Sequence, residues 1–178
     1  SYEIKILEKK NWPPLLVETP KPPSKLYYAG SLPDYTRKFL CVVGSRKYTS
    51  YGRDAVEYLI KGLRGYPVTI VSGLALGIDS FAHMNALKYG LSTIAIPGSG
   101  LNPKALHPQS HLRLAEEIAE KEGALLSEFE PDFKATFWSF PQRNRIMAGI
   151  SHATLLIEAG EKSGTLITAK LATDYNRE

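Results

Sequence analysis

The sequence predicts an α/β fold with a doubly wound, mostly parallel sheet and helices on both faces. Three observations predict it: short apolar runs rich in β-branched residues, helical stretches between these runs, and glycine-rich turns where the runs end. Each run is almost continuously apolar, as expected for a parallel strand that is covered on both faces. Five such strands are expected, over residues 39–44, 68–72, 93–96, 124–127 and 153–158.

Helices are expected between these strands. Residues 51–63 place five apolar side chains on one stripe, which is the spacing of a helix with one buried face. Further helices are expected over residues 80–88, 112–122 and 166–175. Right-handed strand–helix–strand units bring the carboxyl ends of the strands to one edge, where ligands bind in Rossmann-like folds.

The start of the chain differs from the rest in composition. Five of the 12 prolines fall within residues 1–24, and proline at that density disfavours regular helix and favours extended chain. We therefore expect a Pro-rich arm or linker over residues 1–24, followed by a Rossmann-like domain over residues 25–178.

Composition limits the function classes. The 178 residues are 43% hydrophobic and 22% charged, as in ordinary globular proteins, and no apolar run approaches the roughly 18 residues of a membrane span. A single cysteine rules out an intramolecular disulfide and fits a reducing cytoplasm. The formal charge of +4 permits a polyanionic partner without requiring one.

The first expected strand ends in a small, cationic turn. Glycine permits a tight turn, and backbone N–H groups with a serine hydroxyl can meet an anion near the next helix start. An arginine adds a bidentate donor for phosphate, although a solvated loop arginine explains the same pattern. The residues of this turn are Gly44, Ser45, Arg46 and Lys47.

The turns after the second and third strands are also rich in small residues, which lets the backbone approach a ligand closely. They do not form the G-x-G-x-x-G fingerprint after a first strand, so nicotinamide cofactor binding is disfavoured and no cofactor is expected. The expected pocket-lining residues are Ser72, Gly73, Gly77 and Gly98.

We expect the acidic and histidine side chains that could serve as metal ligands or acid–base catalysts to have structural roles instead. Asp79 is expected to be the N-cap of the following helix rather than a catalytic acid. His83 and His111 are expected to pack or cap helices, because no cysteine or H-E-x-x-H sequence joins them in a zinc pattern. No metal site is expected.

The segment 137–151 combines aromatic rings with cations. Phe140 precedes Arg143, Asn144 and Arg145 at an expected helix start, and stacking surfaces beside arginines are the ingredients of a single-strand nucleic-acid site. The alternative is that the arginines are solvated. The neighbouring Phe137 and Trp138 are expected in the core.

After the fifth strand, Ser163, Gly164 and Thr165 open the last expected helix. Hydroxyls and free N–H groups at a helix N-terminus make a phosphate cradle. No G-x-x-x-x-G-K-[ST] sequence is present, so ATP hydrolysis is disfavoured.

Taken together, these motifs resemble the DprA/Smf family of bacterial DNA-processing proteins, in the right order along nearly the whole chain. The chain departs from the family in having His107-Pro108 where many members have Tyr-Pro, and in ending where the family usually continues into another strand and a further small domain. The motifs that carry the resemblance are Gly44-Ser45-Arg46, SGLALGIDSFAH (72–83), FPQRNRIMAGIS (140–151), SGTLITAKLA (163–172), WPPLL (12–16) and KLYYAG (25–30).

The resemblance implies single-stranded DNA binding without sequence preference, a role in natural transformation, loading of the RecA recombinase, and a homodimer. It implies that Arg46 contacts a DNA phosphate and that segments 143–145 and 163–165 line the same pocket. Phe140 would stack on a base or shape that pocket.

Two other functions stay open. The LOG-type phosphoribohydrolases share a related layout and use P-G-G-x-G-T-x-x-E near the corresponding turn, but Thr168 stands where that motif has its glutamate. A site without this carboxylate lacks a group that could activate water. A nucleotide-sensing module that uses the same phosphate pocket is the other alternative.

Overall fold

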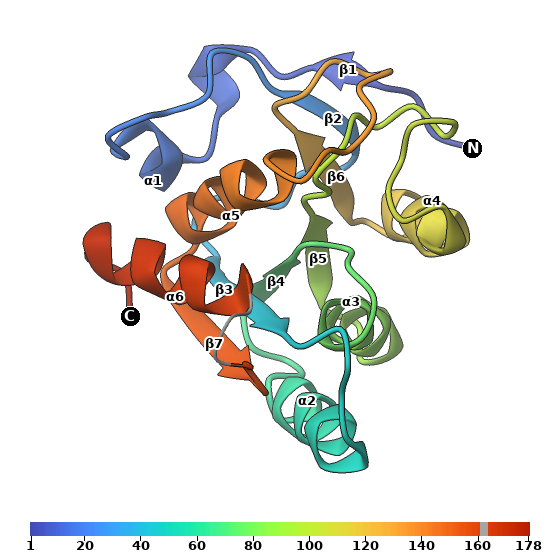
Figure 1. Ribbon diagram of the computed structural model, residues 1–178, viewed down its shortest axis with the longest axis vertical. Helices are drawn as coiled ribbons and strands as arrows, with labels where there is room; N and C mark the ends of the chain where they lie inside the picture. Colours follow the sequence, from blue (N-terminus) through green and yellow to red (C-terminus); the bar gives the residue numbers. More distant parts are fainter. Residues whose placement is uncertain (161–163) are drawn as a thin grey trace.

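The computed structural model describes residues 1–160 and 164–178, which form one seven-stranded sheet of order β1-β2-β6-β5-β4-β3-β7 (Figure 1). The strands β6, β5, β4, β3 and β7 are parallel, whereas β1 and β2 are antiparallel to their neighbours. This arrangement confirms the predicted Rossmann-like fold. The strands are β1 (Lys5–Ile6), β2 (Tyr27–Gly30), β3 (Lys38–Gly44), β4 (Val68–Ser72), β5 (Ser92–Ala95), β6 (Ala124–Ser127) and β7 (Ala153–Ile157).

Helices cover both faces of the sheet (Figure 1). The helices are α1 (Pro14–Val17), α2 (Ser50–Gly62), α3 (Ile78–Lys88), α4 (Leu112–Glu120), α5 (Ser139–Ile150) and α6 (Gly164–Asp174), with short 3-10 turns at Lys9–Asn11 and Gln109–His111. Helices α2, α3 and α4 lie on one side, and α1, α5 and α6 on the other. No helix within the described ranges is long and apolar enough to cross a membrane.

The alternation of side chains along β3 divides the core into layers. Successive residues of a strand point to opposite faces. Cys41 and Val43 pack in the cluster that includes α5, whereas Val42 packs with Val56 of α2 and Ile78 of α3. These three residues of β3 are all buried although they point to both faces, which explains why this part of the strand is continuously apolar.

The five predicted strands and the four predicted helices are confirmed, with ends that shift by at most two residues. β1 and β2 were not predicted from the sequence. β2 pairs with β6 over a register from Tyr27↔Ser127 to Gly30↔Ala124. Its assignment as a strand depends on this partner, almost 100 residues away, and not on a local apolar run.

The N-terminal segment, predicted as a Pro-rich extended arm, also contains a one-turn helix. Pro14 occupies the first position of the one-turn helix α1, where a missing N–H costs nothing. Leu7, Trp12 and Leu16 are buried in the cluster that contains α5, and Trp12 Nε1–H donates to the Leu7 carbonyl at 2.9 Å. The division of the chain into arm and domain stays a prediction.

Candidate functional site

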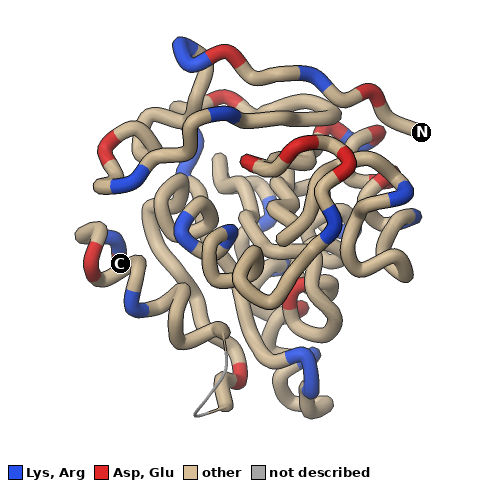
Figure 2. Tube along the Cα trace, turned by 45° about the horizontal axis from the view of Figure 1, so that its top comes forward, with Lys and Arg blue, Asp and Glu red and all other residues tan. Residues whose placement is uncertain are grey.

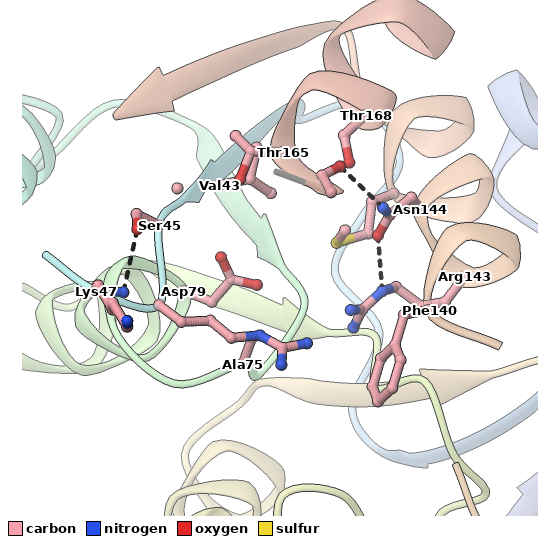
Figure 3. Close-up of a pocket in the computed structure, with 14 residues that line it drawn as sticks. Val43, Ser45, Lys47, Ala75, Asp79, Phe140, Arg143, Asn144, Thr165 and Thr168 are labelled. Carbon is pink, nitrogen blue, oxygen red and sulfur yellow. Dashed lines mark hydrogen bonds between the residues drawn. The ribbon is translucent and has the colours of Figure 1, made fainter. Parts of the chain in front are cut away.

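A cavity of about 330 Å³ lies beyond the carboxyl ends of β3, β4 and β7 (Figure 3). The connection after β3 runs over one face of the sheet, while α5 on the other face leads into β7, so the cavity occupies the switch point of the fold. Its lining combines cations, hydroxyls and one aromatic ring. The lining residues are Val43, Gly44, Ser45, Arg46, Lys47, Ala75, Asp79, Phe140, Arg143, Asn144, Met147, Gly164, Thr165 and Thr168.

The turn after β3 forms one wall. Gly44 touches β7 so closely that a Cβ atom there would lie 2.0 Å from the Ile157 carbonyl oxygen. Ser45 N–H donates to the Glu158 carbonyl at 2.8 Å, and Ser45 Oγ accepts from Lys47 N–H at 3.1 Å. These bonds fix the turn, which carries the exposed side chains of Arg46 and Lys47 along the cavity.

Arg143 on α5 supplies a buried positive charge on the opposite wall. Its Nη1 donates to the carbonyl oxygens of Gly73 and Ile96, both at 2.7 Å, and its Nε donates to Asn144 Oδ1 at 2.9 Å. Burial lowers the pKa of Arg143 to about 10, and attraction to Asp79 opposes this change. Arg143 therefore stays cationic at neutral pH and also ties together the ends of β4 and β5.

The N-terminus of α6 closes the cavity. Asn144 Nδ2 donates to the Gly164 carbonyl at 3.2 Å, which joins α5 to the start of this 11-residue helix. Thr165 and Thr168 lie one turn apart and face the cavity (Figure 3). A helix N-terminus carries free N–H groups and a partial positive charge, both of which favour an anion.

Phe140 stands between the two arginines. The guanidinium carbons of Arg46 and Arg143 lie 5.4 and 5.7 Å from its ring centroid, within the range of a cation–π contact. His107 packs edge-on against the same ring, with centroids 5.3 Å apart, and lines a small adjoining hollow. Burial, followed by Arg46 and Arg143, lowers the pKa of His107, so the imidazole is neutral at pH 7.

Asp79 lies inside the cavity and is 5% exposed. The prediction that it caps α3 was wrong, because Gly77 takes the N-cap position with φ 81° and ψ −128°, a conformation that favours glycine. Asp79 Oδ2 instead accepts from Gly73 N–H at 3.0 Å. Burial raises its pKa, while Arg143 and the backbone N–H groups of Gly73, Gly44 and Ala75 lower it.

The structure separates Arg145 from the other predicted site residues. Its Nη2 donates to Glu128 Oε2 at 2.5 Å, and the two side chains are only 19% and 7% exposed. Ser163 lies outside the described residues, so its predicted place beside Gly164 and Thr165 stays a prediction.

The predicted pocket-lining residues support the walls more than they line the cavity. Ser72 Oγ–H donates to the Val42 carbonyl at 2.6 Å. A Cβ atom on Gly77 would lie 2.5 Å from the Ser45 carbonyl oxygen, and one on Gly98 would lie 2.6 Å from the Phe140 ring. Gly73 lines the adjoining hollow.

Sequence reasoning missed several cavity residues: Val43, Ala75, Met147 and Thr168 as lining groups, and Asp79 as a cavity carboxylate. Thr168 could have been found, because it follows Thr165 by three residues and shares its helix face. The prediction that Phe137 and Trp138 are core residues was wrong, since they are 89% and 45% exposed. They precede α5 on the surface, where Trp138 contacts Phe129 and Phe133 edge-on or tilted.

His83 and His111 make hydrogen bonds within the fold. His83 Nδ1 lies 2.8 Å from Thr93 Oγ1, and His111 Nδ1 lies 2.7 Å from the Leu74 carbonyl oxygen. Over residues 1–160 and 164–178, no three His, Cys, Asp or Glu side chains gather as metal ligands would.

Comparison with known proteins shows close relatives. The family model described as DNA recombination-mediator protein A matches residues 3–178. Protein Smf of Escherichia coli is 42% identical over 167 residues, which are 94% of this chain and 44% of that protein. The chain therefore spans less than half the length of this relative.

Solved structures agree with the sequence relatives. DNA processing protein A from Streptococcus pneumoniae superposes with a TM-score of 0.88 at 35% identity, covering 100% of this chain and 62% of that one. DNA processing protein A from Helicobacter pylori, whose structure is described as showing a single-stranded DNA binding mode, gives 0.86 at 32% identity and covers 99% and 79%.

Proposed function

This chain belongs to the DNA recombination-mediator protein A family, and we propose that it binds single-stranded DNA without sequence preference, as a binding protein and not a catalyst. One observation carries the proposal. Arg46 and Arg143 flank the Phe140 ring in the lining of a cavity that the N-terminus of α6 also lines. Cations and helix N–H groups suit phosphates, and aromatic rings suit bases.

In this proposal the phosphates of a strand pass over the cavity, and the bases project away from it. Arg46 and Lys47 are exposed and contact phosphate oxygens. Arg143 is held by three hydrogen bonds from its Nε and Nη1 to protein groups. It therefore contributes a fixed positive charge to phosphate binding. Its Nη2 has no partner among the described residues and is available to donate to a phosphate oxygen. Such contacts read the backbone and carry no sequence information.

The cavity geometry argues against the phosphoribohydrolase alternative. Thr168 faces the cavity at the position where that motif has its glutamate, and it is 1% exposed. A hydroxyl there cannot act as a general base for water at neutral pH. Asp79, the carboxylate among the described lining residues, accepts a hydrogen bond from the Gly73 N–H instead.

The proposal extends to the role that the family resemblance implies. We infer that the whole protein, as a homodimer in the cytoplasm, protects incoming single strands during natural transformation and helps load the RecA recombinase onto them. A strand-exchange assay with RecA and a single-strand-binding protein tests this role. Stimulation that requires Arg46 supports it, and stimulation that is equal for an Arg46→Ala variant contradicts it.

The direct test of binding is fluorescence anisotropy of labelled oligo(dT) over a salt series, with duplex DNA of equal length as competitor. We expect salt-sensitive binding that the duplex displaces poorly. Arg46→Ala should weaken binding to all sequences alike, and should reduce the slope of log K against log salt by about 0.7, the contribution of one single-strand phosphate contact.

Arg53 provides the matched control. It lies on the exposed side of α2, pairs with Asp54, and is not part of the cavity lining. Arg53→Ala removes the same net charge and should leave the affinity and the salt slope close to those of the parent protein. Equal effects of the two variants would contradict a phosphate site at Arg46.

A further inference from the structure

The cavity holds one carboxylate among its described lining residues. Asp79 shares the cavity with the cationic side chains of Arg46, Lys47 and Arg143 (Figure 3). Asp79 and Arg143 are both buried, but within the described chain no ion pair joins them at 4.0 Å or less. A negative charge therefore faces the space that an anionic ligand would enter.

We propose that Asp79 makes the cavity selective for singly charged phosphodiesters over doubly charged terminal phosphates. The preferred ligand is then the interior of a strand, and free nucleotides and phosphorylated strand ends are disfavoured. This inference rests on the proposed function, because it takes the cavity as the phosphate site.

The selectivity follows from charge. An internal phosphodiester carries one negative charge, whereas a terminal phosphate carries about −1.5 to −2 near pH 7 because its second pKa is near 6. The second charge meets Asp79 in a site with less water than the surface, where Coulomb interactions are stronger. The buried charge of Arg143 is offset by Asp79, and Arg46 and Lys47 are solvent-exposed, so water and salt screen the attraction that would compensate.

Asp79 is held in place within the cavity. It belongs to the first turn of α3, and its Oδ2 is bonded to Gly73 N–H. Burial is the largest effect and raises the pKa of Asp79, and the Arg143 charge and the N–H groups of Gly73, Gly44 and Ala75 oppose this rise by stabilising the ionised form. Arg46, Lys47, Arg143 and the adjoining His107 are the other ionisable groups that face this space.

The test uses two competitors that differ by one charge: thymidine 5′-monophosphate and its methyl ester, which is a phosphodiester. Each displaces labelled oligo(dT) from the protein at pH 7.5, where His107 is neutral, and the ratio of their inhibition constants is measured. We expect the methyl ester to compete about tenfold more strongly with the parent protein. Asp79→Asn keeps an oxygen for the Gly73 N–H and should bring the ratio close to one.

Glu158→Gln is the matched control. Glu158 follows β7 at the same edge of the sheet, accepts from Thr49 N–H at 2.8 Å, and is not among the lining residues. It removes the same charge and should leave the ratio unchanged. Circular dichroism and thermal unfolding establish that each variant is folded.

The outcomes separate this inference from the proposed function. Equal potency of the two competitors toward the parent protein, including displacement by neither, overturns the selectivity even if Asp79→Asn fails to fold. A ratio that Asp79→Asn leaves unchanged, or that Glu158→Gln changes equally, overturns the role of Asp79 while strand binding stands. Failure of oligo(dT) to bind the parent protein overturns both.

Discussion

Arg143 and Asp79 bind the two backbone polar groups of a single residue, Gly73. The Gly73 carbonyl accepts from Arg143 Nη1 at 2.7 Å, and its N–H donates to Asp79 Oδ2 at 3.0 Å. The opposite charges of the cavity are thereby held apart by one peptide segment and kept at fixed positions. Figure 2 shows that Lys and Arg are spread over several parts of the trace. The positive charge of the cavity therefore depends on where its own cationic side chains lie more than on the net charge of the chain.

Gly73→Ala should damage this arrangement. A Cβ atom would lie 2.6 Å from Arg143 Nη1 and 2.7 Å from Asp79 Oδ2, and both groups are fixed by hydrogen bonds. We expect a loss of about 1–3 kcal/mol in the free energy of unfolding, measured with urea, and weaker oligo(dT) binding. Gly62→Ala is the control, because a Cβ atom there meets nothing within 4 Å, and its stability should not fall.

Arg145 should contribute to the stability of the fold and not to DNA binding. Arg145→Met leaves the Glu128 carboxylate buried without its partner, which should cost about 3–5 kcal/mol of unfolding free energy. The double variant Arg145→Met/Glu128→Leu should recover most of this loss and bind oligo(dT) with the parent affinity. Lys170→Ala, in the exposed pair with Asp174, should cost less than about 1 kcal/mol.

A fall in oligo(dT) affinity of the folded double variant, together with a shallower salt slope, would instead show that Arg145 contacts the strand. Urea unfolding and anisotropy on the same preparations distinguish the two outcomes.

Phe137 should stack on a base. Its side chain is 89% exposed and it precedes Phe140, a cavity-lining residue, by three residues, so it offers an exposed ring for stacking. Phe137→Ala should weaken oligo(dT) binding by about 1–3 kcal/mol without lowering stability. Binding of an abasic strand should not change, and Tyr58→Ala, which removes a 78% exposed ring from α2, should have no effect on either strand.

Stability should fall in mild acid because of His83. Burial, and then His111, lowers the pKa of His83 to about 3, while in the unfolded chain it is near 6.5. The unfolded state therefore binds the extra proton between these values, so this stabilisation is complete above pH 6.5 and is lost as the pH falls toward 3. Between pH 7 and pH 5 we expect a loss of about 2 kcal/mol from this group.

Urea unfolding of the parent protein and of His83→Gln at both pH values measures this contribution. The variant should be less stable at pH 7, because a flexible amide replaces the imidazole and changes the Thr93 contact, but it should lose less stability on acidification. Identical losses for the two proteins would contradict the assignment to His83.

The parallel strands could be predicted from the sequence because a strand that is buried on both faces is a continuous run of apolar residues. β1 and β2 could not be predicted in this way, because β2 is defined by its pairing with β6 and β1 by its pairing with β2. The direction in which side chains of α5 point could not be predicted either. Arg143 and Arg145 are two residues apart, about 200° around a helix, and therefore face opposite sides. No local signal says which of the two meets the cavity, because the answer depends on where Glu128 and the ends of β4 and β5 lie.

The three hydrogen bonds of Arg143 have a consequence for variation within such a chain. A substitution at Arg143 removes a charge from the site and at the same time releases the Gly73 and Ile96 carbonyls that it holds. A substitution at Arg143 would therefore reduce the amount of folded protein in the cell, whether or not the ligand is present. Selection against misfolding alone would then preserve the cation, even during periods when its ligand is absent.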